Sequence, residues 1–496
     1  MHGGAIDTVL FVHGYSVTDL RTFNALPDLL VADGISRQKI FLAGFVSLDD
    51  RVSCDDLAAG LEARVSMLEL SYGLDLSRTI LISHSTGAIV SRRWILKRRA
   101  MNSSDATKKT LSHFLSCAGA NHGSTMAQLG QTQLAYLFRS ITQGQSVGKR
   151  VLEDLDYGSA FLRSLNRDWL DAWNDAANPL YADTFCFSIG GTDHSFWQNH
   201  LTWQSREFGS DGTVRISGAN LNYRWISVPG TQSAYNLETL SQPAPHLVVE
   251  TPDKKYSHTS QDAPDTQNLV IGAANAVGEI VHGFKGETDA LSSKTFGIVE
   301  GVLAAAERPY TAIREAMSVQ NVDAYKALAT AWAQQTAGWT GNNPDGANST
   351  VVVALTDRAG LIVDDSLVLL RDSGGTIGNV SPSLLSNQPI HNGVTPSVMS
   401  FYVNFNVFEN GHPHSIHVQA LTDTPYVTYG GTVDGDLSGG TDHVIAPNEF
   451  TYVSVNMDRD PAATFAFAQL SDPNLAALLE ISFPPFIQAG WIYSLK

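Results

Sequence analysis

The sequence predicts an α/β fold with a mostly parallel sheet, followed by a C-terminal β-sandwich-like domain. Two patterns support this prediction. Residues 6–100 alternate apolar, strand-like runs with stretches of helical period, which is typical of a parallel sheet covered by helices on both faces. Beyond residue 350 the hydrophobic period changes to two, and turn residues separate short strand-like runs. With 496 residues the chain is long enough for two or three domains.

The composition supports a substantial core and argues against some partners. Hydrophobic residues make up 43% of the chain, and 49 acidic against 32 basic residues give a net charge of −17, which disfavours nucleic acid or an anionic membrane surface. Three scattered cysteines indicate neither a disulfide framework nor a zinc site. No apolar run is long enough for a transmembrane segment, and no signal peptide is visible. Secretion by processing or by a signal-independent route and a cytoplasmic location stay open, as does the oligomeric state.

The first strand is expected over residues 6–12, and it runs into His13 and Gly14. A helix over 18–32 and a strand over 39–46 follow. Ser53, with Asp56 three positions later, then predicts a capped helix start.

Residues 79–90 have the composition of a nucleophile elbow, a strand that turns sharply into a helix. Residues 83–87 (SHSTG) follow the G-x-S-x-G pattern, with Ser83 in place of the first glycine. The tight turn requires small residues two positions on either side of the central serine, which Ser83 and Gly87 satisfy. It also places the Ser85 hydroxyl at a helix N-terminus, where N–H groups favour a developing oxyanion. We therefore predict that Ser85 is a nucleophile.

Two loops are expected at the same edge of the sheet as Ser85. The first strand ends at His13 and Gly14, where the backbone N–H of Tyr15 can face the oxyanion. A strand over 113–117 ends in the glycine-rich loop 119–124, which should lie beside Ser85.

An acid and a base follow later strands. A strand over 184–189 precedes a loop that ends at Asp211, and a short strand over 247–249 precedes a loop with His258. This gives the chain order serine, acid, histidine that accompanies the elbow motif. A neutral imidazole can take the serine proton, and the carboxylate can orient the imidazole.

Alternatives exist for both roles: Asp193 for the acid, and His246 or His282 for the base. His13, Gly14, His84 and Trp197 are predicted to form the substrate-binding surface. His84, inside the elbow, and His122, in the glycine-rich loop, are also interpreted as structural or rim residues.

Residues 126–177 break the strand–helix alternation with amphipathic helices rich in leucine and aromatic residues. Such a stripe is often part of a core. Because it interrupts the rhythm next to the predicted site, a helical cap over about 126–180 is favoured.

With these motifs in hand, the chain resembles the bacterial lipases of the α/β-hydrolase fold and the wider lipase-like group that includes inositol deacylases. Residues 158–166 (GSAFLRSLN) are similar to a cap-region segment of those lipases, and the resemblance spans about residues 1–285. It implies a carboxylic ester hydrolase acting on lipid-like acyl esters through an acyl-enzyme on Ser85. It also implies Asp211 as the acid, His258 as the base and an oxyanion hole formed by the N–H groups of Tyr15 and Thr86.

The sequence departs from these lipases at Ser83 and in the longer stretch between Asp211 and His258. No cofactor is expected. Some of these lipases hold a structural calcium near the histidine loop, for which Asp253 and Asp262 are available. The same triad also fits a phospholipase A or an acyltransferase, and a non-catalytic protein that binds through its β-domain is a further alternative.

The predicted domain boundaries are a catalytic domain at 1–290, a helical connector at 291–340 and a β-rich domain at 350–496. Residues 339–349 have the composition of a linker. The β-rich domain contains three closely spaced histidines, which are interpreted as solvated rather than as a metal site: His412, His414 and His417.

Overall fold

The computed structural model describes most of the chain up to residue 249 and a large part of the remainder. The described residues are 5–15, 23, 26–124, 127, 148–191, 209–210, 214–229, 235–249, 308–342, 348–357, 363, 366–372, 390–395, 397–406, 408, 411, 414–420, 428–429, 433–436, 444–457 and 459–460. The statements below concern these residues.

The first layer is a six-stranded parallel sheet in the order β2-β1-β3-β4-β5-β8, which confirms the predicted α/β class. Its strands are β1 (Thr8–Val12), β2 (Ile40–Ala43), β3 (Thr79–His84), β4 (His113–Cys117), β5 (Phe185–Gly191) and β8 (His246–Val249). Every residue of all these strands except β2 is buried, as expected of parallel strands covered on both faces.

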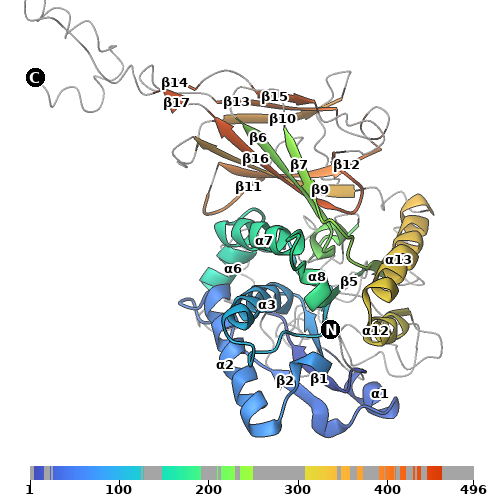
Figure 1. Ribbon diagram of the computed structural model, residues 1–496. Helices are drawn as coiled ribbons and strands as arrows, with labels where there is room; N and C mark the ends of the chain where they lie inside the picture. Colours follow the sequence, from blue (N-terminus) through green and yellow to red (C-terminus); the bar gives the residue numbers. More distant parts are fainter. Residues whose placement is uncertain are drawn as a thin grey trace, which may run out of the picture.

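Helices cover both faces of this sheet. In Figure 1, α2 and α3 lie on one side of the strands, and α1, α12 and α13 lie on the other. Their bounds are α1 (Leu26–Ala32), α2 (Cys54–Tyr72), α3 (Gly87–Ser104), α12 (Arg308–Ser318) and α13 (Val322–Asn342). The predicted start of α2 is confirmed, because Ser53 and Asp56 form a reciprocal capping box there.

The described part of the inserted segment packs into the core. It forms α6 (Lys149–Leu155), α7 (Ala160–Trp173) and α8 (Leu180–Asp183), and Ser159 caps α7 by accepting a hydrogen bond from the backbone N–H of Leu162. Trp169 and Trp173 are fully buried in the same hydrophobic core as the parallel sheet, so the aromatic stripe of α7 is core. The residues of the predicted cap at 125–126 and 128–147 lie outside the described residues.

The second part contains a mixed six-stranded sheet in the order β11-β12-β9-β16-β6-β7. These strands are β6 (Tyr223–Pro229), β7 (Asn236–Thr239), β9 (Asn348–Asp357), β11 (Ile390–His391), β12 (Val398–Asn404) and β16 (Phe450–Met457). A three-stranded sheet of β10 (Ser366–Arg371), β13 (Ser415–Ala420) and β15 (Val433–Asp436) stacks on it, with a short pair β14 (Thr428–Tyr429) and β17 (Arg459–Asp460) beside them (Figure 1).

The central strands of the mixed sheet are buried on both faces, and alternate residues of β9 belong to different cores. Val351, Val353 and Leu355 of β9 pack in the core of the sandwich, which also contains residues of β10 and β13. Val352 and Ala354 pack in the core shared with the parallel sheet. Because the side-chain period of a strand is two, one strand seals both cores, and the β-domain is joined to the first part by a continuous apolar interface.

Two features differ from the sequence interpretation. Strands β6 and β7 lie within residues 1–290 yet belong to the same sheet as the C-terminal strands. β16 runs parallel to both β6 and β9, and β7 pairs with β6. Residues 339–342 of the predicted linker continue α13 instead. There Thr340 bonds back to the carbonyl of Thr336 and accepts a hydrogen bond from Asn448, so tertiary contact extends the helix beyond what its glycines favour.

Candidate active site

Ser85 has the strained backbone that an elbow requires. It follows β3 directly, its φ is +54°, and it is 8% exposed. Of the three described non-glycine residues with positive φ, Ser85 and Ala118 come directly after the neighbouring strands β3 and β4, and the third is Asn448. An alanine or serine in this region costs of order 1–3 kcal/mol, and such strain clusters at functional sites.

Glycines allow the backbone to close around Ser85. A methyl group at Gly14 would lie 2.8 Å from Cβ and 3.3 Å from Oγ of Ser85. At Gly87 it would lie 2.4 Å from the carbonyl oxygen of His13, and at Gly119 it would lie 2.6 Å from Cβ of Ala88. Three loops therefore meet at the serine with no room for side chains between them.

The glycine-rich loop after β4 lies beside Ser85, as the sequence predicts. The backbone N–H of Ala120 donates to the carbonyl of Ser85 at 3.1 Å, and that of Ser85 points to the carbonyl of Cys117 at 3.4 Å. Asn121 is fully buried, and its side-chain amide donates to Ser116 Oγ and to the carbonyl of Ala219. Asn121 has no signal in the sequence beyond its place in this loop.

The candidate oxyanion donors lie at two of these loops. Thr86 is the N-cap of α3, and N–H groups of a first helical turn have no acceptor within their own helix. Tyr15 follows Gly14, which contacts Ser85. Its partly buried phenol has a pKa raised above its usual range by desolvation and by Asp50, so the phenol stays protonated near neutrality.

The ring of His13 is fully buried and has both nitrogens engaged. Its Nδ1 faces the carbonyl of Gly14 at 2.8 Å, its Nε2 accepts from the N–H of Phe45 at 2.9 Å, and it stacks on the Phe45 ring. Since a carbonyl only accepts, the proton sits on Nδ1. The ring of His13 therefore shapes the loop that carries Gly14, and its contact with substrate stays a prediction. His84 is also buried, at 4% exposed. A methyl group added at Gly14 would lie 3.2 Å from its Nδ1.

The candidate acid and base lie outside the described residues, as do Trp197, Asp193, His282, Asp253, Asp262 and His412. The residues that flank Asp211 are described. Ser210 and Arg215 form an isolated β-bridge, and the short helix α10 (Ile216–Ala219) follows. Because the N–H of His122 donates to the carbonyl of Gly218, this segment is tied to the loop beside Ser85. The strand before His258, β8, lies next to β5 in the sheet.

The alternative base His246 is the first residue of β8 and is buried. Burial lowers its pKa to about 3, and its Nδ1 bonds with Ser188 Oγ at 2.8 Å. An imidazole this hard to protonate, paired within the sheet, is poorly suited to accept the serine proton.

Among the described residues, no three histidine, cysteine or carboxylate side chains gather in a way that could hold a metal ion. No described helix is long and apolar enough to cross a membrane.

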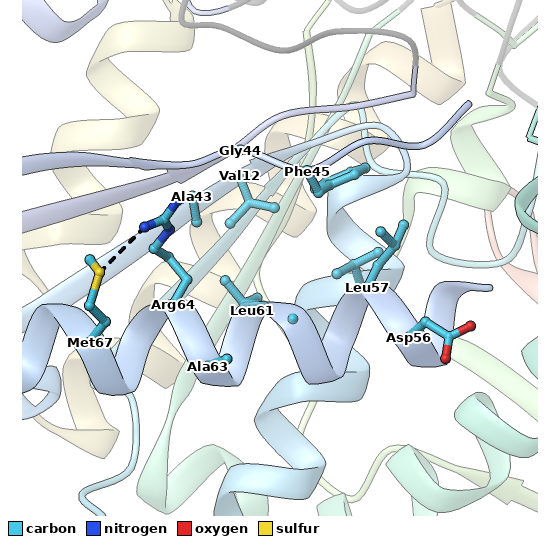
Figure 2. A pocket seen from close by; sticks show the side chains of 12 residues that line it. Val12, Ala43, Gly44, Phe45, Asp56, Leu57, Leu61, Ala63, Arg64 and Met67 are labelled. Carbon is cyan, nitrogen blue, oxygen red and sulfur yellow. Dashed lines mark hydrogen bonds between the residues drawn. The ribbon is translucent and has the colours of Figure 1, made fainter. Parts of the chain in front are cut away.

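An apolar pocket of about 430 Å³ opens between α2 and the end of β2. Figure 2 shows Val12, Phe45, Leu57 and Leu61 converging on it, with Arg64 and Met67 at one end. Its wall adjoins the loop near Ser85, because Val12 precedes His13 and Phe45 stacks on the His13 ring.

The parallel sheet, the strained serine after β3 and the loops around it define an α/β-hydrolase fold. Solved structures share it. Phospholipase PlaB from Legionella pneumophila is 22% identical, with a TM-score of 0.71, over 94% of this chain and 97% of that one. The same phospholipase in complex with thio-NAD is 21% identical, with the same coverage and TM-score.

The mature lipase BlEst2 from Bacillus licheniformis overlaps less, at 20% identity over 44% of this chain and 81% of that one, with a TM-score of 0.32. No protein-family model matches the chain, and the comparison with curated proteins found no match. The likeness to PlaB covers both parts of the chain, so the β-domain belongs to the shared fold.

Proposed function

We propose that this protein is a serine hydrolase that cleaves carboxylic esters, with lipid-like acyl esters as its substrates. The observation that carries the proposal is the positive φ of Ser85 at the strand–helix junction, with Gly14 against its hydroxyl side. A strained, nearly buried serine at a helix N-terminus has no evident structural purpose, whereas it is what a nucleophile elbow needs.

In this proposal Ser85 attacks the ester carbonyl, and His258 takes the hydroxyl proton. Asp211 holds the imidazole in the correct orientation and stabilises its charged form. The N–H groups of Tyr15 and Thr86 receive the negative charge on the carbonyl oxygen. His258 then gives its proton to the departing alcohol, leaving an acyl group on Ser85. Water attacks this acyl-enzyme with His258 again as base, which releases the acid and restores the serine.

A lipid-like acyl substrate is supported by the apolar pocket between α2 and β2. Its lining includes the buried apolar side chains of Val12, Leu57 and Leu61, and Val12 lies two residues before Gly14 in the chain. A phospholipase A is the second candidate, because PlaB, a solved structure that shares the fold over 94% of the chain, is named a phospholipase.

The test combines covalent labelling with a substrate series. We expect a fluorophosphonate probe to label the wild-type protein and not Ser85→Ala, because the probe phosphonylates activated serines. p-Nitrophenyl esters of rising chain length and phosphatidylcholine vesicles would then rank short esters, long esters and phospholipids. Full esterase activity in Ser85→Ala, or a wild-type protein that neither reacts with the probe nor cleaves any ester, would refute the proposal and favour a binding protein.

A further inference from the structure

We propose that Tyr452, which belongs to the β-domain, is a positioning residue of the candidate active site: its hydroxyl orients the His122 ring and thereby holds the loop that supports Ser85. The inference rests on the proposed hydrolase function and assigns the β-domain a part in catalysis. His122 and Tyr452 lie 330 positions apart in the chain, and their side chains meet at 3.3 Å between Nδ1 and the phenolic oxygen.

The partners of His122 determine which nitrogen carries the proton. Its Nε2 lies 2.9 Å from the carbonyl oxygen of Asn220, which can only accept, so Nε2 donates. Nδ1 is then an acceptor, and the Tyr452 hydroxyl donates to it. The ring is fully buried, stacks on Phe450 and has a pKa well below its usual range, so it is held neutral in one orientation.

The same hydroxyl links back to the helix that follows Ser85. It accepts from the side-chain amide of Asn166 on α7 at 2.7 Å, and Asn166 Oδ1 accepts from the guanidinium of Arg92 at 2.9 Å. Arg92, on α3, also donates to the carbonyl of Asn121 at 2.7 Å. The chain of hydrogen bonds therefore runs from α3 through α7 and β16 to the loop next to the serine.

All of these side chains are buried, so water does not substitute for a lost partner. Arg92, Asn166 and His122 are each 0% exposed, and Tyr452 is 2% exposed. A buried network of this kind specifies one geometry when all its members are satisfied, and it shifts when one member is lost.

The loop at residues 119–124 contacts both the elbow with Ser85 and the segment that follows Asp211, so a shift of the loop reaches both. On one side Ala120 donates to the carbonyl of Ser85, and a methyl at Gly119 would collide with Ala88. On the other side the backbone of His122 and the side chain of Asn121 bond to Gly218 and Ala219, in the helix that follows Asp211. The loop thus couples the nucleophile to the segment carrying the candidate acid.

The test is Tyr452→Phe, which removes the hydroxyl and keeps the ring. With active sites counted by fluorophosphonate titration, we expect kcat on p-nitrophenyl acetate to fall about tenfold per titrated site at unchanged KM, equivalent to ~1.4 kcal/mol. The matched control is Tyr325→Phe on α13, whose buried hydroxyl donates to the carbonyl of Cys186 at 2.8 Å. The control should lower the melting temperature and leave kcat per site unchanged.

A second variant approaches the same contact from its other side. His122→Gln can keep an N–H for the carbonyl of Asn220, while its amide oxygen no longer lies at the Nδ1 position that accepts from Tyr452. It carries the test if Tyr452→Phe does not fold. The double variant should be no slower than the slower single one, since both remove one interaction. The inference is overturned if the single variants keep the wild-type kcat per site. It is also overturned if the loss of kcat in the double variant is the product of the two single losses. An inactive wild-type protein would instead refute the proposed function.

Discussion

Replacing Gly14 with alanine should remove most of the activity while the protein stays folded. The added methyl would lie 2.8 Å from Cβ of Ser85, whereas carbon atoms in contact normally sit about 3.5–4.0 Å apart. Gly14 is not among the residues with positive φ, so alanine is compatible with its backbone and the conflict is one of space alone. Relief requires the 13–15 loop and Ser85 to separate by roughly 0.7 Å.

That displacement affects the reaction more than the fold. The N–H of Tyr15 is the proposed oxyanion donor next to Gly14, and such donors act at about 2.7–3.1 Å from the oxyanion. Losing one donor typically costs about 10²–10³ in kcat, or ~3–4 kcal/mol. We therefore expect kcat of Gly14→Ala on p-nitrophenyl acetate to fall about 100-fold. KM should change little, because the donor binds the oxyanion of the transition state and contributes little to binding of the substrate.

The assay measures kcat and the melting temperature for Gly14→Ala beside Gly338→Ala. Gly338 lies on α13, where an added methyl meets nothing within 4 Å. The control should keep wild-type kcat and gain up to about 1 kcal/mol of stability from better helix propensity. A Gly14→Ala protein with wild-type kcat would refute the placement of the 13–15 loop at the reacting carbonyl.

Two further predictions concern stability. Burial raises the pKa of Asp156, whose carboxylate accepts from the N–H of Gly393 in the β-domain, to about 7. The pKa of Asp156 is therefore higher in the folded state than in the unfolded state. Its protonated carboxyl stabilises the fold fully below about pH 4, and up to ~4 kcal/mol of this stabilisation is lost as pH rises to about 7. In Asp156→Asn the urea midpoint should depend less on pH over this range. If its pH dependence equals that of the wild type, Asp156 is not the titrating group. Ser53→Ala removes the α2 capping box and should cost about 1 kcal/mol in urea unfolding at unchanged kcat; an unaltered midpoint would show the cap to be dispensable.

Much of the region around Ser85 was predictable, because its signals are local. The apolar run of β3, the small residues around Ser85 and the capping residues Ser53 and Asp56 act over a few positions, and the structure has the strand, the turn and the cap where they were expected. The assignment of Asp211 and His258 stays a prediction, since it depends on chain order and on where later strands end.

The roles of individual histidines were less accessible. His13 was expected to bind substrate and His122 to be a structural or rim residue; both rings are fully buried with their nitrogens engaged, which agrees with the structural alternative for His122. His246 was a candidate base until the structure placed it at the start of β8 against Ser188. Partners of a buried histidine come from distant segments, so the sequence around it does not reveal them.

The sequence by itself determined the strand–helix alternation, the position of the elbow and the change of period near residue 350, because each is recorded in neighbouring residues. Only the tertiary structure decided that β6 joins the C-terminal strands, that α13 extends through Asn342, and that Tyr452 meets Asn166 across 286 positions. The physical reason is that a local pattern specifies which face of an element is buried, whereas pairing depends on what the folded chain brings against that face.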